Sequence, residues 1–246
     1  MQKKVAVVTG GNTGIGLATV KKLIEDGYST VALGLGDPPD VAGGALRYYP
    51  CDVSNSAQVA AAFGSIEENF GRVDALVNNA GVLSYGDAVE LSEEEWDRVM
   101  AVNVKGPWLC AKHAIPLMPP GSVVINVASV QSFVAQPLVA AYATSKAAIL
   151  GLTRSIAIDF SPQVRCVAVC PGTIDTPMLK GALEQASDPE AMMQELNDAH
   201  LSGRIGTADE VAELIAFLAG DKCAFINGQA IRVDGGLGIN VGGSKN

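Results

Sequence analysis

Short apolar runs rich in β-branched residues alternate with helical patterns along almost the whole of this 246-residue chain. Several runs are continuously apolar, which is typical of strands that are buried on both faces of a sheet. The expected strands are Val5–Val8, Thr30–Leu33, Leu46–Pro50, Ala75–Val77, Ser122–Val127, Val164–Val169 and Ala230–Val233. The expected helices are Gly16–Asp26, Ala57–Phe70, Glu93–Met118, Ala141–Phe160 and Ala208–Ala219. This rhythm predicts an α/β fold in which helices cover both sides of a parallel sheet, in one domain over residues 1–246.

A glycine-rich turn joins the first expected strand to the first expected helix. It reads TGGNTGIG from Thr9 to Gly16. Without side chains, such a loop lets the backbone approach a pyrophosphate, and the helix that follows supplies amide donors and partial positive charge. The turn therefore indicates a dinucleotide site, although tight strand-to-helix turns also use glycine for purely structural reasons.

Tyr142 and Lys146 are spaced to lie on one face of an expected helix, with Ser129 upstream in INVASV. A nearby ammonium stabilises phenolate and lowers a tyrosine pKa from its ordinary value of ~10. The pair therefore favours acid/base chemistry on an alcohol or carbonyl oxygen. A surface contact, with Ser129 ending a strand, is the structural alternative.

These motifs occur in a characteristic order. They are TGGNTGIG, NNAG at 78–81, Asn103, Ser129, Tyr142-x-x-x-Lys146 and PGTIDT at 171–176. Together they resemble the short single-domain branch of the short-chain dehydrogenase/reductase family, over essentially the whole chain. The resemblance implies a Rossmann-type doubly wound parallel sheet of about seven strands, a nicotinamide cofactor and a homotetramer. It also implies an NAD(P)-dependent enzyme that interconverts a secondary alcohol and a carbonyl by hydride transfer.

The same resemblance implies roles for individual residues. Tyr142 would be the catalytic acid/base, and Lys146 would lower its pKa and hold the nicotinamide ribose. Ser129 would stabilise the reacting oxygen, and Asn103 would anchor a water that leads toward Lys146. The other cofactor positions would be Gly10, Asn12, Thr13, Gly14, Ile15 and Gly16 at the pyrophosphate and adenosine, Asp52 and Val53 at the adenine, Asn79, Ala80 and Gly81 at the ribose, and Pro171, Gly172, Ile174 and Thr176 near the carboxamide.

The segment that usually selects the cofactor departs from the family pattern. Gly34 stands where an acidic residue normally accepts bonds from the 2′-hydroxyl of NAD, and Thr13 is not basic. The nearest charge is Asp37, which would repel a 2′-phosphate, although it could simply initiate the turn at Pro38. We therefore expect NAD(H), with NADP(H) not excluded.

The substrate side is less constrained. The polar segment at about 173–205, which contains Pro177 and Pro189, is interpreted as a substrate lid. Pocket-wall candidates are Tyr85, Gln131, Gln136 and Met178. The two glutamines favour a hydroxylated substrate such as a sugar or polyol, unless they face solvent. A 3-ketoacyl or hydroxysteroid-type ketone stays open as the substrate.

Two other classes of protein are disfavoured. A cofactor-binding regulator typically lacks the tyrosine or the lysine. A longer-branch epimerase or dehydratase is disfavoured by the chain length.

Composition limits the partners. The net charge is −9 and there is no basic run, which argues against nucleic acid, and no apolar stretch is long enough for a membrane span. The five cysteines form no CxxC, which favours free thiols in a reducing, cytoplasmic setting. His113 and His200 are far apart in the sequence without a partnered cysteine, so we expect no metal site.

Overall fold

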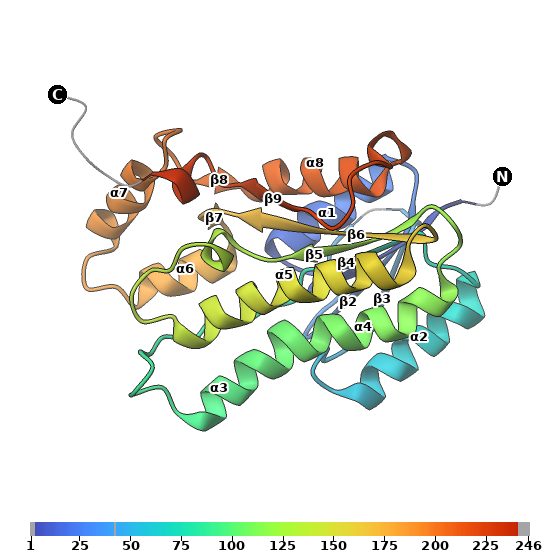
Figure 1. Ribbon diagram of the computed structural model, residues 1–246, viewed down its shortest axis with the longest axis horizontal. Coiled ribbons are helices and arrows are strands. Elements are labelled where there is room, and N and C mark those ends of the chain that lie inside the picture. Colours follow the sequence, from blue (N-terminus) through green and yellow to red (C-terminus); the bar gives the residue numbers. More distant parts are fainter. Residues whose placement is uncertain (1–2, 42, 241–246) are drawn as a thin grey trace.

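A computed structural model describes residues 3–41 and 43–240; the ends of the expected domain, residues 1–2 and 241–246, lie outside this range. A seven-stranded sheet forms its centre, in the order β3-β2-β1-β4-β5-β6-β9 with every pairing parallel (Figure 1). The strands are β1 (Val5–Thr9), β2 (Ser29–Gly34), β3 (Leu46–Pro50), β4 (Ala75–Asn78), β5 (Ser122–Val127), β6 (Val164–Pro171) and β9 (Ala230–Val233). All seven expected strands are confirmed, with ends that differ by at most two residues.

Helices cover both faces of this sheet. On one face, α1 (Gly14–Glu25) and α8 (Ala208–Ala219) pack against each other and bury Leu23 and Ile215. The helices on the other face, which enclose Ile66 and Leu109, are α2 (Ser56–Phe70), α4 (Gly106–Ala114) and α5 (Ala140–Phe160). The chain is therefore a single-domain, doubly wound Rossmann-type fold, as the sequence predicts.

The predicted helix Glu93–Met118 is not uniform. It consists of α3 (Glu93–Met100), a π-helical turn (Ala101–Lys105), α4 and a 3₁₀ turn (Ile115–Leu117). Pro107 explains the interruption, because it has no N–H for the carbonyl of Asn103 and its ring would crowd that carbonyl in a regular α-helix. The wider π turn accommodates both effects, and single π turns often occur at functional sites.

The segment at 173–205 lies beside the carboxyl ends of the strands, at the left of Figure 1. It contains β7 (Ile174–Asp175), α6 (Pro177–Glu184) and α7 (Pro189–Ala199), and β7 pairs in parallel with β8 (Gly206–Thr207). The two prolines do not interrupt this segment. Each opens a helix, because the first helical position needs no N–H donor.

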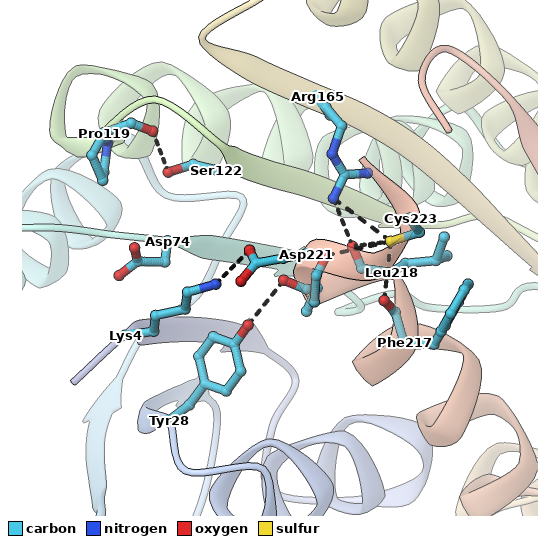
Figure 2. A network of polar contacts seen from close by, with 12 residues as sticks. Lys4, Tyr28, Asp74, Pro119, Ser122, Arg165, Phe217, Leu218, Asp221 and Cys223 are labelled. Atoms are coloured by element: carbon cyan, nitrogen blue, oxygen red, sulfur yellow. Dashed lines mark hydrogen bonds and ion pairs between the residues drawn. The ribbon is translucent and has the colours of Figure 1, made fainter. Parts of the chain in front are cut away.

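A separate polar network joins the amino ends of the strands to the carboxyl end of α8 (Figure 2). Asp74 accepts a bond from the backbone N–H of Val5, and Lys4 pairs with Asp221 at 2.6 Å. Tyr28 donates its hydroxyl proton to the carbonyl of Ala219, and burial raises its pKa to about 12. These contacts stabilise the amino ends of the strands, which lie away from the glycine turn.

Candidate active site

The glycine turn and the end of β4 meet where the strand order reverses, between β1 and β4. This reversal is the position at which open α/β sheets form a ligand crevice. The Thr9 hydroxyl accepts bonds from the backbone N–H groups of Asn79 and Ala80, each at 3.0 Å. The Asn79 amide donates back to the carbonyls of Thr9 and Gly10 at 3.0 and 3.2 Å. The two loops are thereby held in a fixed relation.

The turn has the form of a cradle for a pyrophosphate. Gly10 and Gly14 have positive φ angles of 61° and 51°, and a Cβ at Gly16 would overlap the carbonyl of Gly10. The first turn of α1 has no side-chain cap and no acidic residue. Its amide donors are therefore available to an anion, so the residues of this crevice fit a dinucleotide.

Ser129, Tyr142 and Lys146 line one cavity of about 710 Å³ together with the glycine turn. Helix α5 carries Tyr142 and Lys146 on one face, and the Lys146 ammonium lies 5.6 Å from the centre of the Tyr142 ring. Lys146 is 5% exposed and donates to the carbonyl of Val127 at 2.9 Å. The helical spacing thus brings the acid/base pair together as predicted.

The direction of the tyrosine shift differs from the prediction. Burial raises the pKa of Tyr142, and the neighbouring Ser129 hydroxyl opposes this rise only in part. Burial also lowers the pKa of Lys146 to about 8. Desolvation is the larger influence on the pKa of Tyr142, and it is the Ser129 hydroxyl that opposes it.

Asn103 occupies the π turn and is almost completely buried. Its side-chain oxygen accepts from the backbone N–H of Val82 at 2.8 Å, and its Nδ2 donates to the Val82 carbonyl and to Ser145 at 2.9 and 3.0 Å. Ser145 in turn donates to the carbonyl of Tyr142 at 2.7 Å. Asn103 therefore connects the loop after β4 to the helix that carries the acid/base pair.

Most of the residues assigned from the sequence line the same cavity. They are Gly10, Thr13, Gly14, Ile15, Asn79, Ala80, Gly81, Tyr85, Ser129, Gln131, Gln136, Tyr142, Lys146, Pro171, Gly172, Ile174, Thr176 and Met178. The cavity wall does not include Asn12, Gly16, Asp37, Asp52, Val53 or Asn103.

The adenine contacts expected of Asp52 and Val53 stay predictions, and both residues have contacts within the protein. The Asp52 carboxylate accepts bonds from the N–H and hydroxyl of Ser54 at 2.9 and 2.7 Å. The Val53 side chain is buried beneath Gly106, where an added Cβ would come within 2.9 Å of it. Asp37 is exposed in the loop that follows β2.

The sequence interpretation missed several contributors to the site. Thr9 ends β1, and its hydroxyl orients the Asn79 loop. Ser145 directly precedes Lys146 on α5, and a serine inside an apolar helix face is a signal that could have identified it. Leu237 and Asn240 lie beyond the expected lid and also line the cavity, together with Glu195 and Leu196 from the lid itself.

Neither a metal centre nor a membrane segment is found in the described part of the chain. Among residues 3–41 and 43–240, no group of three or more His, Cys, Asp or Glu residues is arranged to hold a metal ion. Over the same residues, no helix combines the length and apolar character that crossing a bilayer requires.

Comparison with known proteins defines the class. A family model described as enoyl-(acyl carrier protein) reductase matches residues 10–238. The 2-(R)-hydroxypropyl-CoM dehydrogenase of Xanthobacter autotrophicus is 37% identical over 94% of this chain and 97% of that protein. The 3beta-hydroxysteroid dehydrogenase of Mediterraneibacter gnavus is 32% identical over 96% and 95%. Ligand-free aldohexose dehydrogenase of Thermoplasma acidophilum superposes with a TM-score of 0.94 at 39% identity, over 100% of this chain and 98% of that chain.

The chain belongs to the short-chain dehydrogenase/reductase family. It is an NAD(P)-dependent oxidoreductase that interconverts a secondary alcohol and a carbonyl.

Proposed function

We propose that this enzyme is a sugar or polyol dehydrogenase with Tyr142 as its acid/base. Tyr142 accepts the substrate hydroxyl proton in oxidation and returns a proton to the carbonyl oxygen in reduction. The bound nicotinamide would take the hydride from the substrate carbon and return it in the reverse reaction. The observation that carries this proposal is the meeting of Ser129, Tyr142 and Lys146 with the glycine turn in one cavity.

The surrounding residues support these roles. The Ser129 hydroxyl is near enough to Tyr142 to affect its titration and would stabilise charge on the reacting oxygen. Lys146 uses one of its three N–H donors on Val127, which leaves others for the nicotinamide ribose. Asn103, held by Val82 and Ser145, would position the water route toward Lys146. Because burial raises the pKa of Tyr142, its phenol is protonated at neutral pH and can donate the proton that reduction needs. The rate of oxidation should increase as the pH rises, because oxidation needs the phenolate.

The substrate proposal rests on the polar part of the cavity wall. Gln131, Gln136 and Glu195 supply amide and carboxylate groups around an otherwise apolar space, an arrangement that suits a substrate with several hydroxyls. The similarity to the aldohexose dehydrogenase of Thermoplasma acidophilum supports the same class.

A hydroxysteroid is the second candidate. Part of the same wall is apolar and could pack against the fused rings of a steroid. It is formed by Leu83, Val130, Leu179 and Met192. The similarity to the 3beta-hydroxysteroid dehydrogenase of Mediterraneibacter gnavus supports this alternative.

The segment at 173–205 is proposed as the substrate lid, because α6 and α7 contribute Met178, Leu179, Ala182, Met192, Glu195 and Leu196 to the cavity wall. NAD(H) is the proposed cofactor, because Asp37 in the loop after β2 would repel a 2′-phosphate. Burial and, after it, the negative charge of Asp37 raise the pKa of Tyr48 on the neighbouring strand β3. A homotetramer is proposed from the family resemblance. A cytoplasmic location is proposed because the five cysteines are free and buried.

A substrate panel tests the function. Nicotinamide absorbance is followed with aldohexoses, polyols, hydroxysteroids and 3-hydroxyacyl thioesters, each with NAD and with NADP. We expect the highest kcat/KM with an aldohexose or polyol and NAD. Turnover confined to the steroids would replace the sugar proposal, and cofactor binding without any turnover would indicate a regulator.

Two variants test the acid/base. Tyr142→Phe removes only the hydroxyl that exchanges a proton with the substrate. The kcat should therefore fall by roughly 10²–10⁴-fold while the dissociation constant for NADH stays unchanged. Tyr49→Phe is the matched control, because Tyr49 lies on β3 and does not line this cavity. It should keep kcat within about a factor of a few. Turnover like that of the wild type in Tyr142→Phe would refute the assignment.

A further inference from the structure

The end of β2 has an unusual composition for a strand that faces the adenosine half of a dinucleotide. Gly34 is buried there and has an ordinary extended conformation, since its φ is not positive. Glycine is therefore not required at this position by backbone conformation. Its absent side chain instead leaves space for Asn12, because a Cβ at residue 34 would lie 2.6 Å from Oδ1 of Asn12.

The orientation of the Asn12 amide is fixed by its other partner. Nδ2 donates to the backbone carbonyl of Leu35 at 2.7 Å. Since a carbonyl can only accept, the nitrogen must face Leu35 and the oxygen must face Gly34. Among the described residues, no donor contacts this Oδ1.

The backbone around this oxygen is held from two sides. Tyr48 directs its hydroxyl to the carbonyls of Gly34 and Gly36, at 3.0 and 2.9 Å. The N–H of Gly11, next to Asn12, donates to the carbonyl of Leu33 at 3.3 Å. The glycine turn and the end of β2 are thus joined, and a hydrogen-bond acceptor is positioned where the side chain of residue 34 would begin.

We infer that Asn12 replaces the missing acidic residue and that its Oδ1 accepts the hydrogen bond of the adenosine 2′-hydroxyl. This inference rests on the proposed function, which supplies the nicotinamide dinucleotide. An acidic residue at the end of β2 performs this task in ordinary dinucleotide folds. In this chain the acceptor comes from the glycine turn, and Gly34 is the residue that makes room for it.

Cofactor binding, measured without substrate, tests the inference. The probes are NADH and its adenosine 2′-deoxy analogue, titrated by nicotinamide fluorescence. The wild type should bind NADH about three- to tenfold more tightly than the analogue, as expected for one neutral hydrogen bond. In Asn12→Ala the two probes should bind equally. An undiminished preference in Asn12→Ala would overturn the inference.

A second pair of variants tests the exchange of roles. Gly34→Asp alone should weaken binding of both probes, because its Cβ collides with Asn12. The double variant Asn12→Ala/Gly34→Asp frees that space and should restore the preference for NADH, a non-additive result expected for residues in contact. A double variant that binds the two probes equally would contradict the exchange.

Tyr48→Phe is the matched control. It removes the hydroxyl that holds Gly34 and Gly36 but leaves Asn12 in place. Binding of both probes should therefore weaken equally, and the ratio of their dissociation constants should stay as in the wild type. Loss of the ratio in this variant would assign the recognition to the loop rather than to Asn12. A wild type that binds neither NADH nor NADPH would refute the proposed function itself, whereas binding that is insensitive to Asn12 refutes only this inference.

Discussion

At the scale of single residues, Lys146 is an ammonium in a place that disfavours charge. It is 5% exposed, and burial lowers its pKa from 10.5 to about 8. In the unfolded chain the lysine stays protonated up to its ordinary pKa. Burying the charge therefore destabilises the folded protein fully below about pH 8, and this destabilisation shrinks as the pH rises from about 8 to 10.5.

Lys146→Met tests this cost. Relative to the wild type, the variant should be more stable at pH 7 than above pH 10.5 by on the order of 3 kcal/mol, the equivalent of a pKa fall from 10.5 to about 8. The difference should shrink between about pH 8 and pH 10.5. Urea unfolding of the cofactor-free protein at a series of pH values measures it.

Lys112→Met provides the control for this measurement, because Lys112 is exposed and lies over the Trp108 ring. Its effect on the free energy of unfolding gives the baseline for replacing a lysine that solvent reaches. A Lys146→Met effect that does not change with pH relative to this baseline would show that the ammonium is not destabilised by burial. Subtracting the wild type removes contributions from the other titrating groups, which both proteins share.

Spacing in the sequence predicted which residues meet here, but it did not predict how they titrate. The i, i+4 rule brings Tyr142 and Lys146 to one helix face. The net shift of Tyr142 depends on desolvation in the packed molecule and on the hydroxyl of Ser129, which lies outside the helix that carries Tyr142. Such burial is a property of the packed molecule and has no local sequence signal.

At the scale of elements, His200 joins the end of α7 to the turn after β6. It is 3% exposed, and its Nδ1 lies 2.6 Å from the carbonyl of Leu196. Its Nε2 accepts from the backbone N–H of Thr173 at 3.2 Å. In this arrangement Nε2 is the acceptor and Nδ1 is the donor to Leu196. Thr173 lies in the motif assigned to the carboxamide, so His200 links the proposed lid to the proposed cofactor contact.

Two substitutions separate the two bonds of His200. His200→Gln can keep an acceptor toward Thr173, and His200→Asn can keep a donor toward Leu196. If the bond from Thr173 positions the turn, His200→Asn should weaken NADH binding by about two- to tenfold and His200→Gln should not. Fluorescence titration gives the dissociation constants, and equal losses in both variants would point to a general packing role.

The helices and strands differ in how well they could be predicted from the sequence. The seven strands and helices α1, α2, α5 and α8 were predictable because periodicity and burial agree. The π turn at Ala101–Lys105 was not, because helical propensity continues through it and only Pro107 signals the change. Pro177 and Pro189 are compatible with either a break or a helix start, and only the helix that follows each one decides between them.

At the scale of the whole molecule, one face of α5 faces away from its own sheet. Ala147, Gly151 and Ile158 are exposed on it at helical spacing, and Ile158 is 78% exposed. Trp108 on α4 is 47% exposed as well. Small and apolar residues on an exposed helix permit close packing with another helix, so this face is where the proposed homotetramer would bring two copies together.

Gly151→Arg tests that assembly. A Cβ at Gly151 meets no atom within 4 Å in its own subunit, so the arginine should leave the fold intact while blocking contact between two copies. The control is Gly64→Arg on α2, because Gly64 is also exposed, helical and free of neighbours at its Cβ position. Both changes replace a helix-interior glycine, so neither should lower the stability of the subunit. Light scattering should give the mass of four subunits for the wild type and for Gly64→Arg, and a smaller assembly for Gly151→Arg. A monomeric wild type, or a Gly151→Arg protein of unchanged mass, would remove α5 from the interface.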